Sequence, residues 1–470
     1  MTAPPQPSPP AVGVPTDDWY AGKRIVVMGL GRFGGGLGAI RWLVRRHARV
    51  LVTDTADEST LSAPMADLRP LIAAGLVETR FGGHRTADFD DAAMVVVNPA
   101  VPKPWANPFV RAAFNGGAKV TTEIALPLAR VDPDRLIAVT GTAGKSTTAA
   151  MIHHTLRALG REAILGGNIG GSLLDEEESV HRATDIVLEL SSAMLWWLGG
   201  PTGDTFRART AVATNFAPNH LDWHGDLDHY RACKQNLVRG QRAGDTAVLG
   251  PGARDWPPAG GVNIARPTQQ DAPTPAIPGA HNRLNACLAR AAALAHAPDL
   301  NPADIDAALA TFTGLPHRLR LLGVARGVRF YDDSKSTTPE AAALAIQSLA
   351  DAGCSRIHLI AGGYDKGVAL SPMLDPCAAG DARVCRVYAI GATAPAIAAH
   401  LPEDRVEECK TLDAAVALIA RHSTEGDAVL LSPGCASWDQ FENFQQRGRA
   451  FGVAVERTFG GLDSSLDEPA

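Results

Sequence analysis

The stretch LIAVTGTAGKST at residues 136–147 decides how the fold of this 470-residue chain is interpreted. Residues 136–139 are apolar and β-prone, which predicts a buried strand, and residues 145–159 have the composition of a helix. A glycine-containing loop between such elements can point backbone NH groups at anionic oxygens. The stretch therefore predicts a phosphate-binding loop, although Val139 stands where the full pattern has its first glycine.

The same region offers groups for both the phosphates and the metal of ATP. Lys145 can neutralise the phosphates, and the hydroxyl of Ser146 or Thr147 can reach Mg²⁺. Glu189 lies near the end of a later predicted strand, residues 185–190, where proteins with such loops place an acid for Mg²⁺. A lone acid at a strand end is more often solvated, so its role depends on the loop. The predicted loop contacts to ATP are Gly141, Thr142, Ala143, Gly144, Lys145, Ser146 and Thr147.

Strand and helix patterns alternate on both sides of this loop. Strands are predicted at residues 24–28, 49–54 and 93–97 before it, and at residues 328–332, 357–360, 386–390 and 428–431 near the C-terminus. The predicted fold class is α/β with three domains: Rossmann-like at the N-terminus, P-loop ATPase-like with a parallel or mixed sheet in the centre, and Rossmann-like at the C-terminus. The expected boundaries are a flexible Pro-rich tail at 1–20 and domains at 21–129, 130–313 and 314–470, with a hinge at residues 313–317.

Composition excludes several classes of function. A net charge of −6 without runs of Lys or Arg, and an aromatic share of 6%, argue against nucleic-acid binding. The sequence contains no run of 18 apolar residues, so we do not expect it to span a membrane. Seven scattered cysteines without a CxxC pair suggest neither disulfides nor a zinc knuckle, so we expect a cytoplasmic protein that acts on small molecules.

Two motifs support rival interpretations. Gly29, Gly31 and Gly34 with Asp54 match a dinucleotide fingerprint that would indicate an NAD-dependent dehydrogenase, but any diphosphate can rest on such a turn. The separate phosphate loop and the lack of an obvious hydride-transfer site count against NAD. The run NHLDWHGDLDHY at residues 219–230 places His220, Asp222 and His224 at spacings that could ligate a transition metal, as in a metallohydrolase. A polar loop that only caps the next helix is the simpler alternative.

In this order the motifs resemble the Mur ligase family, and within it the MurD-type branch, over nearly the whole chain after the tail. The resemblance rests on GTAGKST (141–147), GGNIG (166–170), ELSS (189–192), NHLDWH (219–224), YRACK (230–234), HNRLNA (281–286), GLPHR (314–318), DDSKSTTP (332–339), GGYDKG (362–367) and LLSPGCASWDQFENFQQRG (430–448). The last three are the most specific for that branch. Ala143, Ala193-Met194 and Asn98-Pro99-Ala100 depart from the usual family residues.

The resemblance implies an ATP- and Mg²⁺-dependent enzyme of peptidoglycan precursor synthesis. It would phosphorylate the carboxylate of UDP-N-acetylmuramoyl-L-alanine and let the amine of D-glutamate attack the acyl phosphate, in the cytoplasm and as a monomer. The alternatives are a related Mur or folylpolyglutamate-type ligase, or an inactive nucleotide-binding regulator.

The resemblance also implies residue roles. One Mg²⁺ would be held by Ser146 and Glu189, and a second by His220 and Lys234, a lysine that is carbamylated in such enzymes but that sequence alone would leave as a solvated helix charge. The UDP-substrate contacts would be Gly29, Gly31, Gly34, Asp54, Thr55 and Asn168. Further ATP contacts would be Asn282, Asn285, Arg318 and Asp333. D-Glutamate would meet Lys335, Thr337, Lys366, Ser437 and Phe444.

Overall fold

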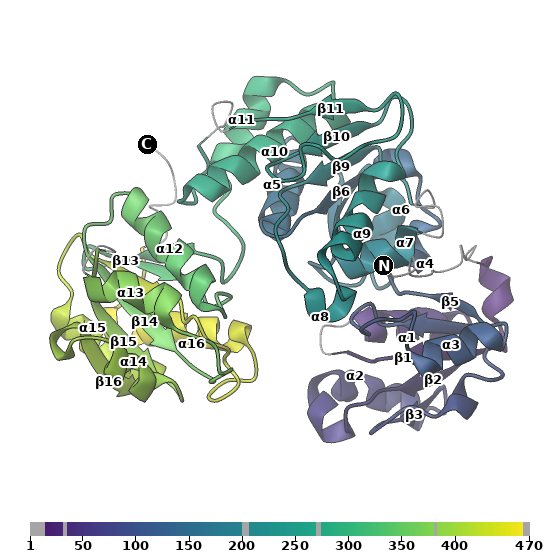
Figure 1. Ribbon diagram of the computed structural model, residues 1–470, viewed down its shortest axis with the longest axis horizontal. Coiled ribbons are helices and arrows are strands. Elements are labelled where there is room, and N and C mark those ends of the chain that lie inside the picture. The colour runs from purple at the N-terminus through teal and green to yellow at the C-terminus, as the bar shows by residue number, and fades with distance from the viewer. Residues whose placement is uncertain (1–14, 32–34, 200–205, 269–273, 380–382, 464–470) are drawn as a thin grey trace, which may run out of the picture. The chain divides into compact units, whose positions relative to one another are not determined.

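The computed structural model describes residues 15–31, 35–199, 206–268, 274–379 and 383–463. It contains three sheets with helices packed against them, which confirms the predicted three-part α/β architecture (Figure 1). The chain forms two compact units. Unit 1 comprises residues 1–271 and 287–305 and holds the first two sheets, whereas unit 2 comprises residues 272–286 and 306–470 and holds the third.

The N-terminal sheet is parallel, with strand order β3-β2-β1-β4-β5. Its strands are β1 (Arg24–Met28), β2 (Arg49–Thr53), β3 (Val77–Arg80), β4 (Met94–Val97) and β5 (Lys119–Thr121). Its helices are α1 (Gly35–Arg45), α2 (Ser62–Ala73), α3 (Pro108–Asn115) and the short α4 (Ala125–Leu128). Residues of α1 and α2 share one apolar cluster and those of α3 another, so the sheet is covered on both faces, as its apolar strands require.

The predicted tail falls largely on residues outside those described. Its last part, Asp17–Tyr20, is a 3₁₀ helix. Tyr20 is buried, and its ring meets Trp42 of α1 edge to face at 5.0 Å between centroids. Tyr20 thus packs against the first domain, and the predicted boundary of the tail at residue 20 stays a prediction.

The central sheet is also parallel, with order β11-β10-β9-β6-β8-β7. Its strands are β6 (Leu136–Thr140), β7 (Ala163–Gly167), β8 (Asp185–Glu189), β9 (Thr210–Ala213), β10 (Thr246–Leu249) and β11 (Asn263–Ala265). The accompanying helices are α5 (Lys145–Ala158), α6 (Glu177–Arg182), α7 (Ser192–Gly199), α8 (Leu221–His224), α9 (Leu227–Arg239), α10 (Ala280–His296) and α11 (Pro302–Ala310). The short β11 lies in a segment whose Pro and Gly content predicts irregular structure.

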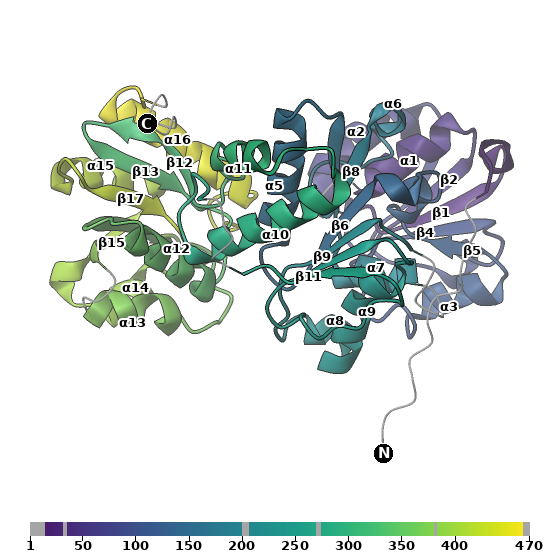
Figure 2. The same ribbon diagram turned by 90° about the horizontal axis from the view of Figure 1, so that it is seen from above.

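Unit 2 contains a sheet of order β12-β13-β17-β14-β15-β16, parallel except for the β12–β13 pair. The strands are β12 (Arg320–Ala325), β13 (Val328–Asp332), β14 (Ile357–Gly362), β15 (Val384–Ile390), β16 (Val406–Lys410) and β17 (Ala428–Leu431). The helices are α12 (Pro339–Asp351), α13 (Ser371–Ala379), α14 (Ala394–His400), α15 (Leu412–His422) and α16 (Phe444–Phe459). Helices α12 to α14 cover one face of this sheet and α15 and α16 the other (Figure 2). Among the described residues, no helix is both long and apolar enough to cross a membrane.

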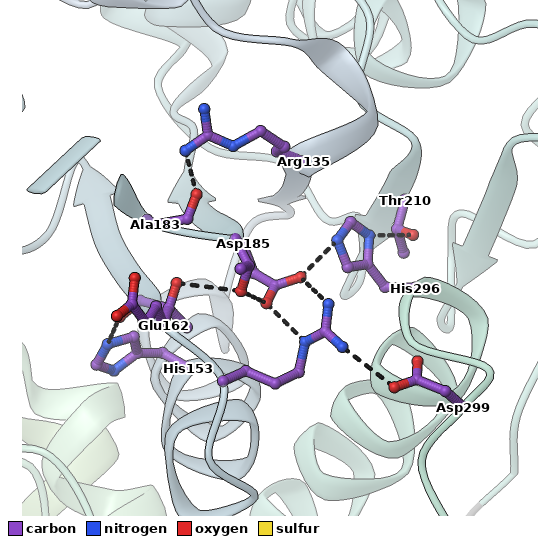
Figure 3. Close-up of polar contacts among 11 residues, drawn as sticks. Arg135, His153, Glu162, Ala183, Asp185, Thr210, His296 and Asp299 are labelled. Atoms are coloured by element: carbon purple, nitrogen blue, oxygen red, sulfur yellow. Dashed lines mark hydrogen bonds and ion pairs between the residues drawn. The ribbon is translucent and has the colours of Figure 1, made fainter. Parts of the chain in front are cut away.

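A buried carboxylate ties the central sheet to the end of α10 (Figure 3). Asp185 begins β8 and is 1% exposed, and it accepts hydrogen bonds from Arg161 Nε (2.7 Å) and Nη2 (3.1 Å). His296 Nε2 lies 3.1 Å from the same carboxylate, and its Nδ1 meets Thr210 Oγ1 of β9 at 3.2 Å. Burial alone raises the pKa of Asp185, but the hydrogen bonds from its partners outweigh that effect and lower it.

We expect Asp185→Asn to lower the free energy of unfolding of unit 1 by about 2–3 kcal/mol at neutral pH, because the change removes one partner of a buried ion pair. A lowered pKa means that the carboxylate stabilises the fold above the unfolded value, about 4, and loses this effect as pH falls through the folded value. The difference between variant and parent should therefore shrink below about pH 4. Urea unfolding followed by tryptophan fluorescence measures it, since seven of the eight tryptophans belong to unit 1.

Asp299→Asn is the matched control. Asp299 also contacts Arg161, at 3.4 Å, but its side chain is 68% exposed. Its loss should change stability by less than about 0.5 kcal/mol, as for other solvent-exposed ion pairs. Equal effects of the two substitutions would contradict a dominant role for the buried carboxylate.

Candidate active site

Parallel pairing brings four chain segments to one edge of the central sheet. In the register of this sheet, Val139 of β6 pairs with Glu189 of β8, and Glu189 pairs with Gly167 of β7. Thr140 at the end of β6 pairs with Ala213 at the end of β9. The residues that follow these strands therefore emerge side by side, which is where open α/β sheets bind ligands.

Asn215 holds the phosphate loop. It follows β9, and its side-chain oxygen accepts hydrogen bonds from the backbone N of Thr142 (3.1 Å) and of Ala143 (2.9 Å). Its side-chain nitrogen donates to the Ala143 carbonyl (3.1 Å), which also accepts from Thr214 Oγ1 (2.6 Å). One amide thus satisfies both backbone polar groups of Ala143 and fixes the conformation of the loop.

Gly141 has to be glycine for two reasons. Its φ is 146°, a region that side chains disfavour, and a Cβ there would collide with Thr214 Oγ1. The second reason is the close packing of β9 against β6, which brings Thr214 over the loop. Ala143 is one of the positions that depart from the usual family residues. It is exposed, so the smaller side chain does not alter the packing of the loop.

The first turn of α5 presents a cation and a helix N-terminus. Lys145 opens the helix after Gly144, and its Nζ donates to the Thr142 carbonyl (2.9 Å), so the ammonium group lies back over the loop. Ser146 is buried at the same helix end. A helix N-terminus with an adjacent ammonium group suits phosphate oxygens.

Glu189 carries a buried oxygen that has no hydrogen-bond partner among the described residues. Its Oε1 accepts from Asn168 Nδ2 (2.9 Å), whereas no described residue hydrogen-bonds Oε2, although the residue is 2% exposed. The backbone N of Asn168 donates to the Glu189 carbonyl (2.8 Å), and a Cβ at Gly167 would collide with that same carbonyl. A buried, unsatisfied carboxylate oxygen is costly unless a cation or donor meets it, and oxygen is the ligand that Mg²⁺ prefers. The site therefore fits Mg²⁺.

Lys234 is a buried amine on α9. It is 1% exposed, its Nζ donates to the Gly141 carbonyl (2.7 Å), and it lies 4.8 Å from the centroid of the Tyr230 ring. Burial lowers the pKa of Lys234 well below its ordinary value, and the charge of Lys145 lowers it further. The residue is therefore not a solvated helix charge, which the sequence alone would favour.

His220 stands at the edge of this site. It is an exposed residue in a left-handed backbone conformation (φ 51°) just before α8. Partial burial of its ring, followed by the positive charges of Lys145 and Lys234, lowers its pKa. His220 thus belongs to the same cluster as the two lysines, and a lowered pKa favours the neutral imidazole that a metal needs.

The metal set suggested by the spacing of His220, Asp222 and His224 does not form. His220 and Asp222 are exposed, whereas His224 is fully buried and its Nε2 faces Ser192 Oγ at 2.9 Å. The short helix α8 turns His224 inwards and leaves the other two outside. The metallohydrolase interpretation is therefore not supported by this geometry.

The N-terminal glycine turn is held by Asp54. Its Oδ2 accepts from the backbone N of Leu30 (2.9 Å) and Gly31 (3.4 Å), and its Oδ1 accepts from Ala56 (2.9 Å). Asn98, from the departure Asn98-Pro99-Ala100, packs against Gly29 and Gly31. Gly34 lies outside the described residues, and Thr55 is exposed. In this structure the Asp54 carboxylate therefore supports the turn itself, and its contact with a ligand stays a prediction.

In unit 2, four of the five residues predicted to bind the amino acid form two contacting pairs. Lys335 Nζ lies 3.9 Å from the centroid of the Phe444 ring, and Lys366 Nζ donates to the Thr337 carbonyl (2.9 Å). The fifth, Ser437, is buried in the middle of the segment between β17 and α16. The edge of this sheet thus carries two exposed lysines within one group of loops.

The ATP contacts predicted in and near unit 2 are largely engaged in hydrogen bonds within the protein. Asp333 is 6% exposed; its carboxylate accepts from Leu319 N (3.0 Å), Ser336 Oγ (2.6 Å) and Ser432 Oγ (2.7 Å). Burial raises the pKa of Asp333 to about 6.

The two asparagines and the arginine of this set lie at chain turns. Asn282 Nδ2 donates to the Pro278 carbonyl (2.6 Å), and Asn285 Nδ2 donates to Asn282 Oδ1 (3.3 Å), both in the first turns of α10. Arg318 is partly buried and directly follows the predicted hinge. Their roles in binding ATP stay predictions.

Sequence reasoning missed two residues that organise these loops. One is Asn215, which follows β9 and lies outside every motif named above, so the sequence did not mark it as a functional residue. Arg447 of α16 is the other: it is 1% exposed, and its guanidinium group donates to Ser334 Oγ (3.0 Å) and to the carbonyls of Ser334 (2.9 Å), Cys435 (3.1 Å) and Ala436 (3.2 Å). It joins the segments that carry Lys335 and Ser437. Arg447 falls within the motif at residues 430–448, but nothing in that motif marks it as a buried residue.

Comparison with known proteins accounts for this arrangement. Three domain descriptions match in succession: Mur ligase MurD-like, N-terminal domain (residues 23–122), Mur ligase middle domain (139–254) and Mur ligase, glutamate ligase domain (317–435). The chain belongs to the Mur ligase family. It is therefore an ATP-dependent ligase, as predicted, and the dehydrogenase alternative is set aside.

Individual relatives support the same assignment. The UDP-N-acetylmuramoylalanine--D-glutamate ligase of Roseobacter denitrificans is 36% identical over 92% of this chain and 97% of its own length. The enzyme of the same name from Anaeromyxobacter dehalogenans is 36% identical over 92% of this chain and 96% of its own. Among solved structures, the UDP-N-acetylmuramate-alanine ligase MurC of Thermotoga maritima matches with a TM-score of 0.57 at 18% identity, covering 93% and 99% of the two chains. Because the sequence identity is only 18%, this structural match supports the fold of the chain and not its substrate.

We expect Asn215→Ala to raise the KM for ATP of this Mur ligase about tenfold or more, because the phosphate loop loses the amide that holds Thr142 and Ala143. Steady-state phosphate release measures the effect. Asn215→Asp keeps the acceptor but turns the donor into a carboxylate oxygen that faces the Ala143 carbonyl, so it should raise the KM at least as much as the alanine variant.

Asn263→Ala serves as the control, since Asn263 is an exposed residue of β11 whose side chain has only a long contact with the Gly244 carbonyl (3.5 Å). It should leave the KM for ATP unchanged. An unchanged KM in Asn215→Ala would show that the loop keeps its shape without the amide.

Proposed function

We propose that this chain joins D-glutamate to UDP-N-acetylmuramoyl-L-alanine, with ATP activating the substrate carboxylate as an acyl phosphate. The observation that carries the proposal is the grouping of the phosphate loop, the unsatisfied Glu189 oxygen and the buried Lys234 at one edge of the central sheet. The names of the relatives, which are D-glutamate ligases, supply the substrate pair.

The chemistry follows from the weakness of a carboxylate as an electrophile. Lys145 and the N-terminus of α5 would bind the ATP phosphates and stabilise charge on the transferring phosphoryl group. Ser146 and Glu189 would hold one Mg²⁺, and His220 with a carbamylated Lys234 would hold a second; bound Mg²⁺ supplies further charge neutralisation and orients the oxygens. Asn215 and Thr214 hold the backbone of the phosphate loop in position.

The groups on unit 2 suit a dicarboxylate amino acid. D-Glutamate carries two carboxylates, which need cationic and hydroxyl partners, and Lys335, Lys366 and Ser437 offer these. Arg447 would act through the backbone segments that it joins and not by contact with the ligand, because it is buried among their carbonyls. The N-terminal sheet, with its glycine turn at the start of α1, would hold the UDP end of the other substrate.

The setting of the reaction is part of the proposal. We place the enzyme in the cytoplasm as a monomer. All seven cysteines are free, which fits a reducing compartment.

An assay of substrate choice tests the proposed function. The protein is incubated with ATP, Mg²⁺ and UDP-N-acetylmuramoyl-L-alanine, and D-glutamate, L-glutamate, L-alanine or L-lysine is added singly. Phosphate release should require D-glutamate, and Lys145→Ala should reduce kcat at least about 100-fold because the phosphoryl charge loses its cation. A parallel reaction replaces UDP-N-acetylmuramoyl-L-alanine with a folate and adds L-glutamate; release there would favour the folylpolyglutamate-type alternative. No release in any reaction would favour an inactive nucleotide-binding protein.

Modification of Lys234 has a separate test. Burial favours the unprotonated form of the Lys234 amine, which is the form that attacks CO₂ with loss of a proton, and the resulting carbamate supplies a carboxylate to a metal. Mass spectrometry of the intact protein in bicarbonate buffer should show one CO₂ adduct, which Lys234→Ala abolishes. Small carboxylates should partly restore activity to that variant. The exposed Lys410 should remain unmodified. If neither the adduct nor the rescue is seen, Lys234 is a structural residue.

A further inference from the structure

Three potential metal ligands meet where α8 and α9 pack together, beside the site described above. His224 ends α8, and His229 and Cys233 lie one turn apart on α9. Their ligand atoms all fall within 4.8 Å of one another. In the part of the chain that the structure describes, no other three His, Cys, Asp or Glu side chains form such a group.

The three side chains lie close enough for one ion, although His229 faces its two neighbours through different ring nitrogens. His224 Nδ1 lies 3.1 Å from His229 Nδ1, and Cys233 Sγ lies 3.6 Å from His229 Nε2. With Zn–N bonds of about 2.0–2.1 Å and a Zn–S bond of about 2.3 Å, tetrahedral coordination puts two nitrogens roughly 3.3 Å apart and a nitrogen and a sulfur roughly 3.6 Å apart. One ion can take only one nitrogen of His229, so the His229 ring must turn until that nitrogen faces both His224 Nδ1 and Cys233 Sγ.

The surroundings already orient the first imidazole. His224 Nε2 lies 2.9 Å from Ser192 Oγ, at the start of α7, so this nitrogen is occupied and Nδ1 is turned towards the cluster. A second hydrogen bond of this kind is what fixes the tautomer of most metal-binding histidines. His224 and Cys233 are buried, 0% and 2% exposed, while His229 is partly exposed and provides the side open to solvent.

Aromatic rings close the cluster on its protein side. Trp105 meets the His229 ring at 4.6 Å between centroids, and Trp223 meets the His224 ring at 4.5 Å. An apolar wall favours neutral imidazoles, and burial is the main cause of the lowered pKa of both histidines, to about 3 for His224. Neutral imidazole is the form that binds metals.

We propose that His224, His229 and Cys233 form a binding site for a thiolate-preferring transition-metal ion such as Zn²⁺, with a fourth position left for water. Two imidazoles and one thiolate select such an ion over Mg²⁺, which prefers oxygen ligands. The site is thus chemically distinct from the Mg²⁺ site at Glu189. The alternative is a hydrogen-bonded chain from Ser192 through both imidazoles to the thiol, with no ion.

A bound ion would join two helices that matter for catalysis. His224 belongs to the helix that starts directly after His220, and Cys233 is the neighbour of Lys234 on α9. The ion would therefore fix α8 to α9 and with it the spacing of His220 and Lys234. Binding of the metal itself does not rest on the proposed function, so the two can fail separately.

Cobalt spectroscopy tests the site in the full-length protein. After removal of metals with a chelator, Co²⁺ is added in the presence of excess Mg²⁺, which occupies oxygen-lined sites. We expect one equivalent to produce the near-ultraviolet band of a thiolate–Co²⁺ bond together with the intense visible bands of tetrahedral Co²⁺. Added Zn²⁺ should remove both by displacement.

Variants decide between the ion and the hydrogen-bonded chain. Cys233→Ser should abolish the thiolate band, and His229→Gln, at a partly exposed position, should weaken Co²⁺ binding at least about tenfold. Cys385→Ser, at a partly exposed cysteine of unit 2, should behave like the parent. No thiolate band in the parent protein, or a band that survives in both Cys233→Ser and His229→Gln, would overturn the proposal. Should Cys233→Ser not fold, His229→Gln alone decides.

Discussion

Lys234 Nζ donates a hydrogen bond to the carbonyl of Gly141, and this contact joins α9 to the phosphate loop in the interior of the central domain. Burying an ammonium group costs several kcal/mol, so the fold can keep this lysine only by holding it uncharged or by giving it a partner of opposite charge. The described structure shows it 1% exposed, beside the positive Lys145 and near Glu189. The reactivity of the site follows from this constraint, because burial favours the uncharged amine, which is the nucleophilic form of a lysine.

Parallel strand pairing is what brings the partners of Lys234 together. The ends of β9, β6, β8 and β7 lie at one edge, so Asn215, the phosphate loop, Glu189 and Asn168 become neighbours although they are distant in sequence. The loop is then supported from both sides: Asn215 holds its backbone, and α9 approaches from the other direction with Tyr230 and Lys234. The His224–His229–Cys233 cluster joins α8 to α9. The position of α9 therefore depends on this cluster as well as on the contact of Lys234 with the phosphate loop.

Much of the fold and part of the candidate site could be predicted from local sequence. Apolar runs at residues 136–139 and 185–190, glycine at 141 and 144, and Lys145 at a helix start are local signals, and the structure contains β6, β8 and α5 at these places. The burial of Lys234, the amide of Asn215 and the buried guanidinium of Arg447 could not be found this way. Each depends on residues far away along the chain, and no local pattern distinguishes them from ordinary polar residues.

The spacing of His220, Asp222 and His224 shows the limit most clearly. Along the chain these three residues look like one metal set, but the turn of α8 places two in solvent and buries the third against α7 and α9. The sequence by itself determined the strand–loop–helix unit, the alternation that makes three α/β domains, and the membership of the Mur ligase family, because these rest on short-range periodicity and contiguous motifs. Only the tertiary structure decided which polar groups are buried, paired or left unsatisfied, because desolvation and hydrogen bonding depend on the elements that surround a side chain and not on its neighbours in sequence.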